Sequence, residues 1–335
     1  MSDLVIAGYN IAKGERKKFF IETAPFYDFT TANIPVEVIR GKKDGPVLFV
    51  SAAIHGDEIN GVKIIINLLK NKRLKSLKGT LIVVPILNTF GFNTKSRYLP
   101  DRRDLNRCFP GNEGGSMASQ LAYLFTKEIV SKCTHGIDIH TGAIHRTNLP
   151  QIRACLKDPQ TKKLAGIFGA PVVINSDLRD GSLREMAREL NIPILLYEAG
   201  EALRFHKQAT HIGVRGILHV MEAIGMLHCK NGVCEYPNVY YAKSSHWLRS
   251  SNSGILHTKY KVGDSVKAGD ILGYTTDPFG DNSHSIIATH SGIIVGQSMI
   301  PLLNRGEAVF HVATFEDINN INEMADSLET ENITS

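Results

Sequence analysis

The feature that most constrains the fold is an alternation, repeated across residues 36–228, of short apolar runs with segments of helical periodicity. The apolar runs have the length of buried strands and span residues 46–50, 81–87, 136–140 and 192–197. Alternating strands and helices predict an α/β domain with a mostly parallel or mixed sheet flanked by helices.

Three of the intervening segments carry helix signals. In the first, apolar residues recur at positions i, i+3, i+4 and i+7, which predicts a buried face made of Val62, Ile65, Ile66 and Leu69. Ser116 stands before an apolar helical pattern and is a candidate N-cap. Ser182 is followed three residues later by Glu185, the pattern of a capping box. We therefore expect helices to begin after both serines.

The composition of the chain changes near residue 230. From there to about residue 316 it consists of short apolar runs separated by Gly, Asp, Asn and Ser, which predicts a small all-β domain. The phrase VGDSVKAGDILG resembles part of a biotinyl/lipoyl-type barrel sandwich, although no lysine follows Lys267 before Arg305 to carry such a group. The expected organisation is an N-terminal extension, an α/β domain, an all-β domain and an acidic, partly disordered tail, spanning residues 1–30, 31–229, 230–316 and 317–335.

Charge and composition exclude several classes of function. The 38 basic and 33 acidic residues among 335 give a net charge of +5, too mild to predict a nucleic-acid partner. The N-terminus lacks the features of a signal peptide, and no run is apolar enough for a membrane span, so we expect a cytoplasmic protein without a membrane partner. Of its five cysteines, Cys229 and Cys234 are the only close pair, and reduced thiols are expected throughout.

Polar residues stand directly after the predicted strands. His55, Glu58, Asn88, His140 and Glu198 each follow or end an apolar run. In open α/β sheets, ligand sites form beyond the carboxyl ends of the strands. We therefore expect these five side chains to converge at one edge of the sheet.

Two histidines and one carboxylate make a known catalytic zinc set that leaves a fourth position for water. His55 and Glu58 lie three residues apart on a predicted strand-to-helix turn, and His140 completes the set, which predicts one zinc ion per chain. Glu198 is placed to act as the general base that such chemistry requires. Asp138, two residues before His140, is a candidate for orienting its imidazole.

A basic, loop-like stretch follows Asn88. Between Lys95 and Arg107 it holds five basic residues against Asp101 and Asp104. This stretch is either a solvated charged loop or an anion pocket, since arginine matches a carboxylate bidentately and stabilises an oxyanion.

The order of motifs resembles the succinylglutamate desuccinylase/aspartoacylase family, which belongs to the carboxypeptidase A-like zinc hydrolases. The strings that carry the resemblance cover about residues 30–225 and are HGDE, NTFGF, SRY, DLNRCFPG, DIHTG and LLYEAGE. The resemblance implies a zinc-carboxypeptidase-like fold followed by a β domain, and a zinc site formed by His55, Glu58 and His140. It also implies hydrolysis of the amide of a small N-acyl amino acid.

The same resemblance assigns further roles. It implies Glu198 as general base and acid, and Arg97 as the group that polarises the scissile carbonyl. Asn106 and Arg107 are similar to the pair that holds a substrate carboxylate. The loop between Arg97 and Asp104 is longer than in aspartoacylases, so the substrate is not fixed by the resemblance.

Several alternatives stay open at this point. A metallocarboxypeptidase or an esterase could use the same residues, and a catalytically inert binding or scaffold protein is the alternative of another class. His145, Arg146 and Arg153 either line the substrate pocket or pack the loop that carries them. The expected partner is a small N-acylated molecule, and the sequence is compatible with a homo-oligomer.

Overall fold

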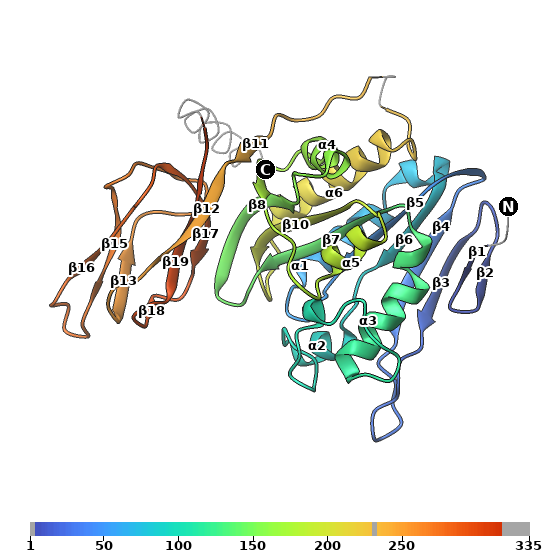
Figure 1. The fold of residues 1–335 in the computed structure, drawn as a ribbon, viewed down its shortest axis with the longest axis horizontal. Helices are drawn as coiled ribbons and strands as arrows, with labels where there is room; N and C mark the ends of the chain where they lie inside the picture. The colour runs from blue at the N-terminus through green and yellow to red at the C-terminus, as the bar shows by residue number, and fades with distance from the viewer. Residues whose placement is uncertain (1–3, 230–232, 317–335) are drawn as a thin grey trace.

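A computed structural model describes residues 4–229 and 233–316, and the predicted disordered tail at 317–335 lies outside them. Within this range the chain forms a long twisted sheet with helices on both faces and a β-rich end (Figure 1). Four neighbouring strands of this sheet run parallel to one another, as predicted: β10 (Ile194–Glu201), β7 (His135–Gly142), β5 (Lys43–Ala52) and β6 (Lys78–Val84). The apolar run 81–87 is a strand only as far as Val84, because Pro85 has no N–H to donate to a ladder.

Antiparallel strands extend the sheet on both sides. β4 (Ile34–Arg40) and β3 (Arg16–Ile21) follow β6, so part of the predicted N-terminal extension forms an edge of the main sheet, while β1 (Leu4–Ile6) and β2 (Tyr9–Ile11) make a separate hairpin. On the other side β8 (Arg146–Ala154) pairs with β10 and carries β9 (Val172–Asn175). The boundaries predicted for the four segments, at residues 30, 229 and 316, stay predictions.

Alternation along the parallel strands explains the two helical layers. In β5, Leu48 and Val50 face one core and Phe49 faces the other, as expected for side chains of period two. The first core is covered by α1 (Asn60–Leu69), α4 (Pro159–Phe168) and α6 (Lys207–Ala223). The second is covered by α2 (Thr89–Thr94), α3 (Met117–Glu128) and α5 (Leu183–Glu189) (Figure 1). Short 3-10 turns complete the domain at Lys72–Ser76 (η1), Leu105–Arg107 (η2) and Val130–Lys132 (η3).

The starts of α3 and α5 agree with the N-caps predicted from the sequence. The buried face of α1 differs from the predicted one. The side chains of Ser116 and Ser182 accept backbone hydrogen bonds at the starts of α3 and α5. The predicted face of α1 is correct at Ile65, which is buried, and wrong at Ile66, which is 42% exposed. The helix buries Gly61, Ile64, Ile65 and Leu68. Because most residues of this helix are apolar, two faces satisfy the helical spacing. Gly61 decides between them, since a Cβ there would lie 2.7 Å from Ala52 Cβ.

The C-terminal part of the described chain is all β, as predicted, and is continuous with the main sheet. β17 (Gly292–Ser298) pairs with β8, β19 (Ala308–Thr314) pairs with β17, and β12 (Ser244–Arg249) pairs with β19. β14 (Ser265–Val266) and β11 (Tyr240–Ala242) join the same sheet through β17 and β9. A second, four-stranded sheet packs beside them and contains β16 (His284–Ile287), β15 (Ile271–Thr276), β13 (Gly254–Thr258) and β18 (Leu302–Leu303).

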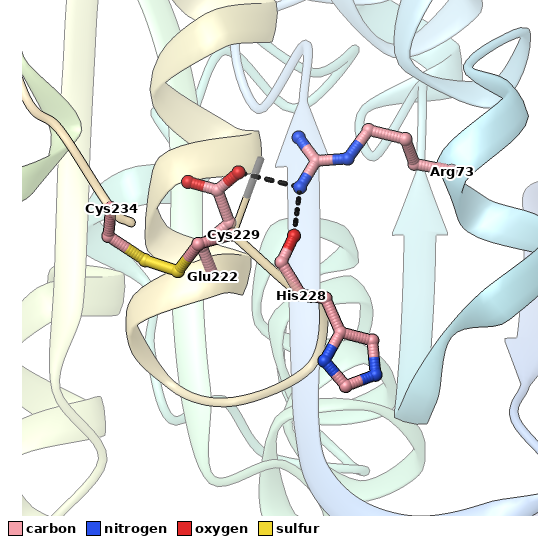
Figure 2. Close-up of a disulfide and its surroundings, with 5 residues drawn as sticks. All are labelled: Arg73, Glu222, His228, Cys229 and Cys234. Atoms are coloured by element: carbon pink, nitrogen blue, oxygen red, sulfur yellow. Dashed lines mark hydrogen bonds and ion pairs between the residues drawn. A yellow bond between two sulfur atoms is a disulfide. The ribbon is translucent and has the colours of Figure 1, made fainter. Parts of the chain in front are cut away.

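The expectation that all cysteines are reduced is wrong for one pair. Cys229 and Cys234 form a disulfide just beyond α6 (Figure 2). Beside it, Arg73 of η1 donates hydrogen bonds to Glu222 of α6 and to the backbone carbonyl of His228, at 2.6 and 2.7 Å. The Cα atoms of the two cysteines lie 5.1 Å apart, a proximity that their spacing in the sequence did not indicate. No helix among the described residues combines the length and apolarity needed to cross a membrane.

Candidate active site

The site begins where β5 ends. Ala53 takes a left-handed backbone conformation (φ +51°) and turns the chain sharply before His55. The amides of Leu87 and Asn88 bond to the carbonyls of Ala52 and Ala53 and fix this turn to the segment between β6 and α2. The turn also needs Gly56, because a Cβ there would lie 1.9 Å from the carbonyl carbon of Gly91 in α2.

Three buried side chains meet beyond this turn. Glu58 Oε1 lies 2.6 Å from His55 Nδ1, and Glu58 Oε2 lies 2.9 Å from His140 Nδ1. Each of the three residues offers a ligand atom, and these atoms lie within 4.8 Å of one another. His55 and Glu58 come from the β5–α1 turn and His140 from β7, so the structure brings the predicted metal ligands together. Two imidazoles and a carboxylate at this spacing fit a zinc ion.

Two aspartates contact the Nε2 atoms of the histidines, on the side of each ring opposite the Nδ1 atom that faces Glu58. Asp138 Oδ2 lies 2.6 Å from His140 Nε2, in the orienting position expected from the sequence, and Asp138 Oδ1 accepts a hydrogen bond from Ser51. Asp104 Oδ1 lies 3.1 Å from His55 Nε2, a contact that sequence reasoning missed. Because each Nε2 is engaged by a carboxylate, both Nδ1 atoms face the shared centre, which is the arrangement metal-binding histidines require.

The charges of this cluster favour a cation. Burial raises the pKa of Glu58, but the attraction of His55 and His140 outweighs it and holds that pKa below its ordinary value. Burial lowers the pKa of His140, yet the Asp138 and Glu58 carboxylates outweigh burial and raise it to about 10. The buried carboxylates therefore stabilise positive charge between them, whether on the imidazoles or on a bound ion.

Arg97 lies beside the cluster, as the family resemblance implied. Its guanidinium contacts Glu58 Oε1 at 3.2 Å and Asp104 Oδ2 at 3.0 Å. Asp104 thus links Arg97 to His55. Asn88, in contrast, does not line the cavity: its side chain accepts a hydrogen bond from Gly91 and caps α2. The expected convergence therefore holds for four of the five strand-end residues.

Glu198 lines the same cavity as the three ligands. Its carboxylate is held by two side chains of β8, with Asn148 Nδ2 donating to Oε1 at 2.8 Å and Arg153 Nε lying 2.5 Å from Oε2. Asn106 and Arg107 also line the cavity, and Asn106 Oδ1 accepts a hydrogen bond from Leu183 at the start of α5. The segment between α2 and α3 is thereby attached to the start of α5.

A family model of the succinylglutamate desuccinylase/aspartoacylase catalytic domain matches residues 44–224, more than half of the chain. The chain belongs to this family. The N-alpha-acetyl-L-2,4-diaminobutyric acid deacetylase of Halomonas elongata is 26% identical over 292 residues, which cover 84% of this chain and 85% of that protein.

Solved structures share the fold of this succinylglutamate desuccinylase/aspartoacylase family member. The succinylglutamate desuccinylase/aspartoacylase from Rhodobacter sphaeroides has a TM-score of 0.79 at 23% identity, covering 90% of this chain and 95% of that one. The product-bound ectoine utilization protein EutE (DoeB) from Ruegeria pomeroyi has a TM-score of 0.81 at 22% identity, covering 91% and 97%. Both likenesses include the C-terminal β part, which lies outside the matched catalytic domain.

The cavity that contains Glu58 and Glu198 is strongly basic in this family member. It has a volume of about 390 Å³ and, among the described residues, its wall includes only two acidic side chains, Glu58 and Glu198. Six arginines line it: Arg97, Arg107, Arg146, Arg153, Arg179 and Arg184. The open question about the β7–β8 loop is thereby answered: Arg146 and Arg153 line the cavity, whereas His145 sits in the turn, where its carbonyl accepts the amide of Met299.

Sequence reasoning missed Arg179, Arg184 and Trp247 on this wall. Arg184 is only 7% exposed, and its hydrogen bonds go to neutral oxygens of Ser176 and Asp177. Burial, reinforced by repulsion from Arg153, lowers the pKa of Arg184 to about 10. A buried guanidinium near other cations is stabilised by an anion, so this wall favours a negatively charged ligand.

Proposed function

We propose that this protein is a zinc-dependent deacylase that hydrolyses the amide bond of a small N-acyl amino acid. The observation that carries the proposal is the buried group of His55, Glu58 and His140 in one cavity with Glu198. The name of the Halomonas relative, a deacetylase of an N-acetylated amino acid, supports the same reaction class.

Each residue has a role in this reaction. His55 and His140, through Nδ1, and Glu58, through its carboxylate, would hold the zinc ion. Zinc would supply a Lewis acid that activates water and polarises a carbonyl group. A Glu198 oxygen takes a proton from the attacking water and delivers it to the leaving nitrogen. Arg97 stabilises negative charge on the carbonyl oxygen, and Asn106 and Arg107 bind the substrate carboxylate.

The positive charge of the cavity narrows the range of substrates that it would bind. The Halomonas relative is named for a diaminobutyric acid, whose side chain carries an amino group. Such a group would lie among the six arginines of this cavity and be repelled. We therefore infer that this chain acts on an acyl amino acid with a second negative group, in the acyl part or in the side chain.

The test is release of a primary amine from substrates matched except for charge. N-acetyl-aspartate, N-acetyl-alanine and N-alpha-acetyl-2,4-diaminobutyrate cover three side-chain charges, and N-succinyl-alanine places the charge in the acyl group. We expect the dianionic substrates to be hydrolysed best by the zinc-loaded protein. Preference for the diaminobutyrate would refute the anionic substrate, and cleavage of short peptides or acyl esters alone would favour a carboxypeptidase or an esterase.

The variant Glu198→Gln keeps the shape of the side chain and removes its base. We expect amine release to fall by about 10²–10⁴-fold, the usual contribution of a general base, with zinc content unchanged. Full activity of this variant would refute the role of Glu198. Absence of hydrolysis in the zinc-loaded wild type, across the whole panel, would favour a binding protein instead.

A further inference from the structure

We propose that Asn148 positions the Glu198 carboxylate and that Gly296, in the C-terminal β part, sets the place of Asn148. The proposal rests on the proposed function, because it takes Glu198 to be the base. It makes the β part a component of the catalytic site rather than a neighbouring module.

The first step is a row of residues that crosses the junction between the two parts of the sheet. Asn148 of β8 pairs with Gly296 of β17, Gly296 pairs with His311 of β19, and His311 pairs with Trp247 of β12. Paired residues in antiparallel strands place their side chains on the same face. The row therefore runs from beside Glu198 into the β part without interruption.

The second step is the space left by the glycine. A Cβ on Gly296 would lie 2.7 Å from Asn148 Oδ1, 3.2 Å from His311 Cβ and 3.5 Å from Trp247 Cη2. The amide of Asn148 thus occupies the place that a side chain at position 296 would take. The φ of Gly296 lies outside the left-handed region, so its backbone would accept alanine. What the position requires is the absence of a side chain.

The third step connects this space to the base. With Oδ1 above Gly296, the Nδ2 group of Asn148 points to Glu198 Oε1 and donates at 2.8 Å. Asn148 is buried, and a hydrogen bond to a charged acceptor is stronger than one between neutral groups. Arg153 holds the other carboxylate oxygen. Two contacts on different oxygens fix the plane of the carboxylate, whereas Arg153 alone would leave it free to rotate.

Packing of the aromatic residues at the far end of the row leaves them little room to move. The rings of Trp247 and His311 stack with centroids 4.7 Å apart, and the Arg146 guanidinium lies 5.2 Å from the Trp247 ring on the cavity side. His311 is itself buried. A side chain at position 296 would therefore displace the end of Asn148 rather than the packed rings, because the amide is the more mobile group.

The experiment compares Gly296→Ala, Asn148→Ala and the double variant, with Thr147→Ala as a control on the neighbouring position of β8. We expect kcat for amine release to fall about 10–100-fold in both single variants, since misplacement of a catalytic group by ~1 Å costs up to about 10²-fold. KM, zinc content and melting temperature should stay close to wild type. The double variant should be no slower than Asn148→Ala, because Gly296 acts through Asn148.

Each departure from this pattern has a defined meaning. Full kcat in Asn148→Ala, beside a slow Glu198→Gln, would overturn the positioning role and leave the proposed function intact. If the fold-loss of kcat in the double variant equals the product of the two single losses, the link from Gly296 to Asn148 is refuted. A crystal structure of Gly296→Ala gives a readout independent of any substrate: we expect the Asn148–Glu198 hydrogen bond to be broken, and its retention would refute the proposal.

Discussion

Replacing Asp138 with asparagine should weaken zinc binding without touching a ligand. Asp138 is 1% exposed and lies 2.6 Å from His140 Nε2 and 2.7 Å from Ser51 Oγ. Asparagine keeps the shape but removes the charge that holds the imidazole in place. Loss of such a partner costs about 10–100-fold in metal affinity, or roughly 1.4–2.8 kcal/mol. The short contact and the complete burial place Asp138→Asn near the upper end of this range.

Asp104 provides an internal comparison, because it contacts the Nε2 atom of the other histidine, His55, but is less buried and makes a longer contact. Its contact with His55 is 3.1 Å, its side chain is 17% exposed, and it shares its charge with Arg97 at 3.0 Å. Solvent and the arginine both reduce what its carboxylate contributes to the imidazole. We therefore expect Asp104→Asn to lose about tenfold in zinc affinity, near the lower end of the same range.

The assay is a zinc titration of the metal-free protein against a chromophoric chelator, at one pH and ionic strength. Asp101→Asn is the matched control, since Asp101 lies in the same loop as Asp104 but bonds the amide of Ala118 at the start of α3. Its zinc affinity should equal that of the wild type. An Asp138→Asn affinity within twofold of wild type, or a larger loss for Asp104→Asn, would refute the reasoning.

Three further predictions concern the rest of the chain. Burial lowers the pKa of His311 to about 3, so the stability present at neutral pH is lost as pH falls from about 6.5 toward 3, by about 2 kcal/mol at pH 5. His311→Phe should show a smaller loss between urea unfolding curves at pH 7 and pH 5; an equal loss would contradict this. Gly61→Val should lower the free energy of unfolding by about 1–3 kcal/mol, because its Cβ would lie 2.7 Å from that of Ala52; an unchanged urea midpoint would count against it. With Cys229 and Cys234 paired, the denatured protein should present three thiols before reduction and five after it; five thiols before reduction would disprove the pairing.

The sequence predicted that His55, Glu58 and His140 would lie together because each follows or ends a predicted parallel strand. His55, His140 and Glu198 end or follow runs that read as parallel strands, and parallel strands place their carboxyl ends together. The same rule was insufficient for Asn88, whose side chain caps α2 within its own loop. A strand-end position indicates the edge of the sheet on which a residue lies, but local hydrogen bonding decides where its side chain turns.

Contacts between residues far apart in the chain could not be predicted, because they leave no periodic pattern in the sequence. Asp104 reaches His55 across 49 residues, and Gly296 meets Asn148 through the pairing of β17 with β8. Arg184 lines the cavity from α5, whose start bonds to Asn106 across 77 residues. The buried face of α1 was predicted only in part for another reason: most residues of this helix are apolar, so more than one face satisfies the helical spacing.

The continuity of the sheet explains why the β part belongs to the site. β8 pairs with β10, which carries Glu198, on one edge and with β17 on the other, so Glu198 and Gly296 lie two strands apart in one hydrogen-bonded sheet. A strand paired on both edges cannot shift without breaking both ladders, whereas an unpaired edge is free to bend or to associate. The position of Asn148 is therefore set from both sides of β8. Because Trp247 of the same β part lines the cavity, the elements that hold Asn148 also form part of the cavity wall.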